Sequence, residues 1–176
     1  MQRYLYQTVS DCSRGYGVVI ILDDVIGESD FQKDALDILK DGNIEETWYN
    51  LNDQHHFDNF CTQFINVANQ YLDLTSCIGY EFWTQNNTKP VDWHYDKDER
   101  LSKDNVFSFP LCSIVYYLVV ENLKGGQLLI EDDIITPRTD RMVIFSPGKL
   151  HTVQSFEGNR VSLLINPWDR DINTFT

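Results

Sequence analysis

A histidine and an aspartate stand two positions apart in the segment Trp93-His94-Tyr95-Asp96. The segment favours an extended strand, and on a strand the side chains at i and i+2 point to the same face. His94 and Asp96 can therefore offer an imidazole and a carboxylate to one metal ion. An HxD pair alone is equally compatible with a histidine that is only hydrogen-bonded to a neighbouring aspartate.

A second histidine strengthens the metal hypothesis. His151 follows the turn residues Pro147 and Gly148 and begins a short predicted strand. Two histidines and one carboxylate form the facial triad of non-haem Fe(II) oxygenases, which leaves coordination positions open. Zinc accepts the same ligands, although hydrolytic zinc sites more often carry paired ligands on a helix. The other two histidines, His55 and His56, lie at the start of a predicted helix, where we expect surface or capping residues.

Arg160 and Ser162 form a candidate anion site, because they share one face of a predicted strand. A guanidinium inside a barrel is costly unless an anion pairs with it, and it matches a carboxylate with two hydrogen bonds. The alternative is a solvated arginine at the end of a strand. Nine positions separate His151 from Arg160, which leaves room for one tight hairpin. Such a hairpin would place the anion pocket on the strand beside the metal.

The N-terminal part of the chain is predicted to contain both helix and strand. Gly17–Ile26 predicts a short buried strand and an acidic turn, and Ser29 and Asp30 can cap a helix over Phe31–Leu39. A longer helix is predicted over Asp53–Leu72. Its apolar stripe consists of Phe57, Phe60, Phe64, Val67 and Tyr71. We expect this stripe to pack against a sheet.

From residue 78 onward, short runs rich in valine, isoleucine and aromatic residues alternate with Gly, Pro and Asn turns. The predicted strands are Ile78–Gln85, Val91–Asp96, Leu111–Val120, Gln127–Glu131, Arg141–Phe145, Leu150–Gln154 and Arg160–Asn166. Turns are expected between them, one of them at Glu157-Gly158-Asn159. This pattern predicts a sandwich or jelly-roll barrel with the N-terminal helices on one outer face.

Length and charge limit the function further. The 176 residues suit one domain, 1–176, with 1–77 as N-terminal support and 78–168 as the barrel. The net charge of −13 repels phosphate backbones and anionic lipids, so we expect no nucleic acid and no membrane partner. The apolar runs are too short to span a membrane. The four cysteines, Cys12, Cys61, Cys77 and Cys112, form no CxxC pair and indicate reduced thiols in a cytoplasmic protein.

Taken together, these residues resemble the Fe(II)/2-oxoglutarate-dependent dioxygenases, in particular the prolyl-hydroxylase-like branch. The resemblance covers about residues 78–168 and rests on an ordered set of motifs rather than on one of them. The set comprises His94-Tyr95-Asp96, Val115-Tyr116-Tyr117-Leu118, Gly125-Gly126-Gln127-Leu128, Asp140–Gly148, His151 and Arg160-Val161-Ser162. It implies a mainly β (α+β) fold, the double-stranded β-helix or jelly-roll, with N-terminal helices packed on one sheet.

The resemblance also implies roles for single residues. His94, Asp96 and His151 match the ligands of Fe(II), and Arg160 matches the partner of the distal carboxylate of 2-oxoglutarate. Tyr117 and Ser162 match groups that support this carboxylate. Trp83 falls where many relatives place a pocket tyrosine. The polar segment Asp98–Phe109 is a candidate lid, and we expect it to border the substrate, since Trp93 and Tyr95 have outward parity relative to the ligands.

The implied reaction is hydroxylation of proline in a peptide, a protein or the free amino acid. It consumes O2 and 2-oxoglutarate and releases succinate and CO2. Two alternatives remain open at this point: a non-catalytic jelly-roll module that binds a metal or ligand, and a dioxygenase acting on a different small molecule. A nucleic-acid demethylase on the same fold is disfavoured by the acidic charge.

Overall fold

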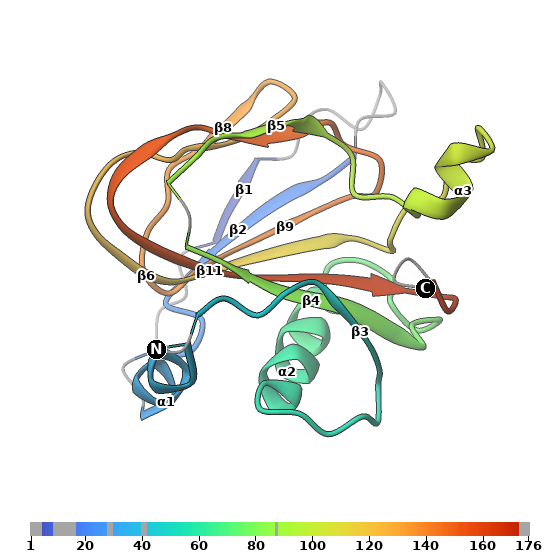
Figure 1. Cartoon of the computed structure of the whole chain (residues 1–176), viewed down its shortest axis with the longest axis horizontal. Coiled ribbons are helices and arrows are strands. Elements are labelled where there is room, and N and C mark those ends of the chain that lie inside the picture. The colour runs from blue at the N-terminus through green and yellow to red at the C-terminus, as the bar shows by residue number, and fades with distance from the viewer. Residues whose placement is uncertain (1–4, 9–16, 28–29, 40–41, 87, 173–176) are drawn as a thin grey trace.

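Two antiparallel sheets face each other in the computed structural model, which describes residues 5–8, 17–27, 30–39, 42–86 and 88–172 (Figure 1). The larger sheet contains, in order, β1 (Leu5–Thr8), β2 (Val19–Asp23), β9 (Arg141–Phe145), β6 (Ser113–Gly125), β11 (Phe156–Trp168), β4 (Gly79–Gln85) and β3 (Thr47–Asn50). The smaller sheet contains β5 (Val91–His94), β10 (His151–Val153), β7 (Leu128–Ile130) and β8 (Asp133–Ile135). From β4 onward the chain passes repeatedly from one sheet to the other. This topology confirms the predicted jelly-roll.

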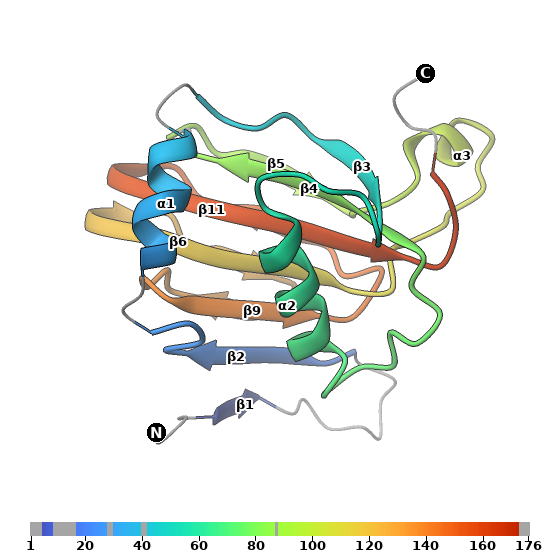
Figure 2. The same cartoon turned by 90° about the horizontal axis from the view of Figure 1, so that it is seen from below.

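The two N-terminal helices cover the outer face of the larger sheet, as Figure 2 shows. They are α1 (Asp30–Ile38) and α2 (Asp58–Ala68). Phe64 of α2 is fully buried and packs on Tyr116 of β6, with 4.6 Å between the ring centroids. Because neighbours alternate along a strand, Tyr117 points to the other face, into the space between the sheets. Consecutive residues of β6 thus contribute alternately to the core beneath the helices and to the interior of the barrel.

Helix α2 is shorter than its apolar stripe predicts, because both ends of the expected helix are diverted into turns. At the start, the His55 ring stacks on Tyr49 at 3.9 Å, and its Nε2 lies 2.8 Å from the Tyr80 hydroxyl. Its Nδ1 accepts a hydrogen bond from the Phe57 N–H. His55 therefore packs against the sheet and fixes the turn before the helix, whereas His56 is exposed. Beyond the last turn, the Asn69 side chain binds the Leu74 N–H and ends the helical path.

Three described strands, β1, β3 and β8, have no counterpart among the predicted ones, and β6 and β11 are longer than predicted. The turn expected at Glu157–Asn159 is wrong, since β11 continues through it beside β6 with an irregular register. Gly158 has a positive φ of 105° there, and a Cβ at this position would lie 2.4 Å from the Asn122 carbonyl oxygen. The glycine thus permits a bulge in a close strand pair.

Three cysteines in the described residues carry free thiols: Cys61 and Cys112 are buried and Cys77 is half-buried. Cys12 lies outside the described residues. No helix in the described part of the chain is both long and apolar enough to span a membrane.

Candidate active site

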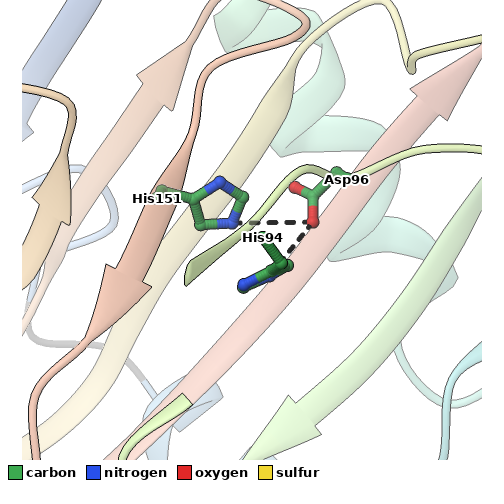
Figure 3. Close-up of side chains that lie close together, drawn as sticks. All are labelled: His94, Asp96 and His151. Atoms are coloured by element: carbon green, nitrogen blue, oxygen red, sulfur yellow. Dashed lines mark ion pairs between the residues drawn. The ribbon is translucent and has the colours of Figure 1, made fainter. Parts of the chain in front are cut away.

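Three potential metal ligands meet between the sheets (Figure 3). His94 ends β5 and pairs directly with His151 at the start of β10, and Asp96 follows two residues beyond His94. The ligating atoms of the three side chains all lie within 4.8 Å of one another. Strand pairing therefore brings together residues that are far apart in the sequence.

The hydrogen bonds of both imidazoles fix which nitrogen is free. His94 Nδ1 lies 2.8 Å from the Asp92 carbonyl oxygen, and His151 Nδ1 lies 3.0 Å from that of Lys149. A carbonyl can only accept, so in the neutral form of each imidazole the proton is on Nδ1 and Nε2 keeps the lone pair. This is the arrangement in which histidines bind metals.

Both Nε2 atoms face the same oxygen of Asp96. Each lies 3.6 Å from Oδ1, which is longer than a good hydrogen bond and leaves the lone pairs around one common point. Burial lowers the pKa of His151, against the opposing pull of Asp96. A neutral imidazole of this kind can bind a cation. The three residues could hold a divalent metal ion.

The other oxygen of Asp96 is held by Ser113, a residue that sequence analysis did not single out. Ser113 is 3% exposed, and its Oγ donates to Asp96 Oδ2 at 2.5 Å. Ser113 begins β6, so the larger sheet orients a ligand carried by the smaller sheet. The sequence alone shows only that a serine shares one face of an apolar strand with Val115 and Tyr117.

We expect Ser113→Ala to weaken binding of Fe(II) or Mn(II) by about 10–100-fold, the usual cost of losing a partner that orients a ligand. Ser113→Thr keeps a hydroxyl and should recover most of the affinity. Anaerobic titration calorimetry measures both constants, and circular dichroism checks the fold. Equal metal affinities for Ser113→Ala and the wild type would contradict this role.

The ligand triad opens into a cavity whose inner end holds a buried guanidinium. Arg160 is 1% exposed, and its Cζ lies 4.4 Å from the centre of the Phe156 ring. It donates to the Gly126 carbonyl at 3.1 Å and to Gln85 Oε1 at 3.3 Å, whereas its Nε has no hydrogen-bond partner. All these contacts are with neutral groups. A buried arginine without a carboxylate partner is an incomplete pair, which an anionic ligand would complete.

Two hydroxyl groups lie on the same cavity wall as Arg160. Ser162 is 2% exposed, and its buried Oγ has no partner. Tyr117 is 1% exposed, and burial raises its pKa to about 12, so it retains its proton and can donate. Tyr116 points away and donates to Asp140 instead. Unpaired donors at Arg160 and Ser162, with Tyr117 beside them, fit a carboxylate group.

The structure corrects the expected hairpin between His151 and Arg160. β10 belongs to the smaller sheet and β11 to the larger one, so Arg160 lies across the barrel from His151 rather than on a neighbouring strand. The chain changes sheets in the connection between these two strands. The anion pocket and the ligand triad share one cavity because the sheets face each other.

The segment 98–109 is not wholly a loop. It contains the short helix α3 (Glu99–Lys103), which Asp98 caps by accepting hydrogen bonds from the Arg100 and Leu101 N–H groups. Trp93 and Tyr95 are exposed, as expected from their parity with the ligands. Trp83 lines the cavity.

The 2OG-Fe(II) oxygenase superfamily model matches residues 79–168, which include all the residues of the triad and of the inner end. No curated protein matches the chain.

Among solved structures, a Pseudomonas putida prolyl-4-hydroxylase is similar, with a TM-score of 0.61, 17% identity and coverage of 87% of this chain and 93% of that one. A viral collagen prolyl hydroxylase from Paramecium Bursaria Chlorella virus-1, in its 2OG complex, has a TM-score of 0.53 and 18% identity and covers 85% and 95%. A Trichoplax adhaerens prolyl hydroxylase in complex with a peptide fragment has a TM-score of 0.58 and 14% identity, covering 86% and 83%. At these identities the likeness shows a shared fold.

Proposed function

Because the chain belongs to the 2OG-Fe(II) oxygenase superfamily, we propose that it hydroxylates proline in a peptide, a protein or the free amino acid. The family uses Fe(II) and 2-oxoglutarate, and the chain is accordingly a 2-oxoglutarate-dependent dioxygenase. One observation carries the assignment of the site: two histidines whose Nδ1 atoms are hydrogen-bonded to carbonyl groups turn Nε2 toward one carboxylate oxygen, in a cavity that also contains a guanidinium with an unpartnered Nε.

His94, Asp96 and His151 would hold the iron in this proposal. The bound metal and cosubstrate couple loss of CO2 from 2-oxoglutarate, which leaves succinate, to transfer of an oxygen atom from O2 into a C–H bond. The protein positions the reactants and shields them from water. The Nδ1 hydrogen bonds of both imidazoles and the Ser113 hydroxyl would keep the three ligand atoms in place.

Arg160, Tyr117 and Ser162 would bind the distal carboxylate of 2-oxoglutarate. Arg160 supplies the charge, and the two hydroxyl groups supply further donors on the same inner face of the larger sheet. Gly125 and Gly126 support this arrangement. Both have positive φ angles, and this turn directs the Gly126 carbonyl toward Arg160. A carboxylate held at one end fixes the orientation of the cosubstrate in the cavity.

Two observations support proline as the substrate. The solved structures named above are of prolyl hydroxylases, and one of them contains a peptide fragment. In addition, the net charge of −13 disfavours a polyanionic substrate such as a nucleic acid. A peptide or small-molecule substrate, together with O2, is compatible with this acidic net charge.

The test is incubation of the Fe(II)-loaded protein with 2-oxoglutarate and a panel of proline peptides and free amino acids. We expect a proline compound to raise succinate release above the uncoupled background and to gain about 16 Da, the mass of one oxygen atom. Should only another amino acid or small molecule do so, the chain is a dioxygenase with a different substrate.

A further inference from the structure

A guanidinium lies at one end of the cavity, and carboxyl groups lie on the same face of the larger sheet beyond the other end. Arg160, Ser162, Leu164 and Asn166 alternate along β11 and all line the cavity. Six residues of strand span about 20 Å, so Asn166 stands well away from the guanidinium. Its direct partner across the strands is Glu81 of β4. An acidic side chain therefore occupies the end of the inner face that is remote from the arginine.

Glu81 is one of two carboxyl groups at this outer end. It is 3% exposed and accepts a hydrogen bond from the buried Trp168 indole at 2.9 Å. The second is the exposed Glu46, which stands two residues before Trp48, the direct partner of Glu81 across the strands, and so lies on the same face of the sheet. Among the described residues, neither carboxyl group forms an ion pair with a lysine or arginine. Burial, followed by the nearby charge of Glu46, raises the pKa of Glu81 to about 8.

Asn166 is an independent sign that a ligand binds here. It is 3% exposed and lines the cavity, yet its amide forms no hydrogen bond with any described residue. Buried amides are usually paired, and one that faces a cavity without a partner is available to a bound molecule. Its neighbours Glu81 and Trp83 lie on the same inner face, so carboxylate, amide and indole groups converge there.

We infer that the outer end of the cavity binds a positively charged nitrogen of the substrate, an ammonium or guanidinium group, against Glu46 and Glu81. A cation would compensate the negative charge of Glu46 and favour ionisation of Glu81, and neither group has a basic partner among the described residues. Trp48 is the strand partner of Glu81, and its indole packs over Gly79. The charge pattern would also keep the two small molecules apart, with the dianionic cosubstrate at Arg160 and the cationic group at the acidic end.

This inference rests on the proposed function and specifies its substrate. The nitrogen could belong to a lysine or arginine beside the reacting residue in a peptide, or it could be the amine of a free amino acid. Both sources present the same chemistry to Glu46 and Glu81, and the experiment distinguishes them.

The test uses the protein loaded with Fe(II) and 2-oxoglutarate and six blocked peptides, with Pro or Ala in the centre and Lys, Gln or Glu on both sides. Anaerobic calorimetry measures binding, and succinate release in air measures turnover. Free proline and N-acetylproline amide form a seventh and an eighth arm. We expect the Lys peptide to bind about tenfold or more tighter than the Gln and Glu peptides, or free proline to bind tighter than N-acetylproline amide by the same factor.

Glu46→Gln is the decisive variant, because this exposed side chain can be changed without disturbing the core. It should remove the charge preference, and Glu46→Lys should reverse it. Glu45→Gln removes the same charge one residue away and should preserve the preference.

Equal affinity for the cationic, neutral and acidic compounds in every arm would overturn the inference. A preference for the cationic compound that Glu46→Gln leaves intact would also overturn it. Proline turnover without charge preference would leave the proposed function standing. A charge preference shared by proline and alanine peptides, without proline turnover, would instead refute proline and retain the cation site.

Discussion

Alanine at position 151 is expected to abolish turnover and to weaken Fe(II) binding by more than about a hundredfold, while the protein still folds. Loss of a group that merely orients a ligand costs about 10–100-fold, so loss of a ligand itself should exceed that range. His151 supplies one of the three ligating atoms that meet at this point in the described part of the chain. Its packing contributes less: the ring contacts Phe145 edge-on at 5.0 Å, and the hydrophobic clusters do not include it.

Anaerobic titration with Fe(II) and 2-oxoglutarate measures this effect through the visible absorbance of the ternary complex. His56→Ala is the matched control, because His56 is exposed and lies outside the cavity. Near-ultraviolet circular dichroism and thermal unfolding establish that both variants are folded. A folded His151→Ala protein with wild-type Fe(II) affinity would show that the metal does not bind at this triad.

Local sequence patterns predict the strands that lie in the middle of the sheets. Arg141–Phe145 is predicted with its observed bounds, and the strand at Gly79–Gln85 differs by one residue, because both are short apolar runs between turn residues. The edge strand β3 has no such signal. Thr47–Asn50 is only half-buried and becomes a strand through pairing with β4. Pairing with a distant partner is a tertiary effect, which a local pattern does not contain.

The same distinction applies to the site. The spacing of His94 and Asp96 determines their shared direction, so that pair could be recognised from the sequence. Ser113, Glu81 and Asn166 could not, because the importance of Ser113 depends on which strands face one another across the barrel, and that of Glu81 and Asn166 on which strands are neighbours in the sheet. The incorrect hairpin before Arg160 has the same origin: its spacing is compatible with a turn, whereas only the sheet order shows that the chain crosses to the opposite sheet.

Replacing Arg160 with alanine should weaken 2-oxoglutarate binding far more than Fe(II) binding. Truncating one partner of a buried, hydrogen-bonded charge pair costs roughly 2–5 kcal/mol, and each 1.4 kcal/mol is about tenfold in affinity. The guanidinium contacts Gly126, Gln85 and Phe156 and none of the three ligands, so Fe(II) affinity should hardly change. Arg160→Lys keeps the charge without the planar fork and should lose less.

A comparison of two cosubstrates separates this role from a general loss of structure. 2-Oxovalerate has the same carbon chain as 2-oxoglutarate but lacks the distal carboxylate. The wild type should strongly prefer 2-oxoglutarate, whereas Arg160→Ala should bind the two almost equally, because the preference is the interaction that the substitution removes. Arg170→Ala, at an exposed arginine paired with Asp169, should keep the wild-type preference. If Arg160→Ala also keeps the preference, or loses Fe(II) and 2-oxoglutarate affinity in equal measure, the guanidinium does not bind the distal carboxylate.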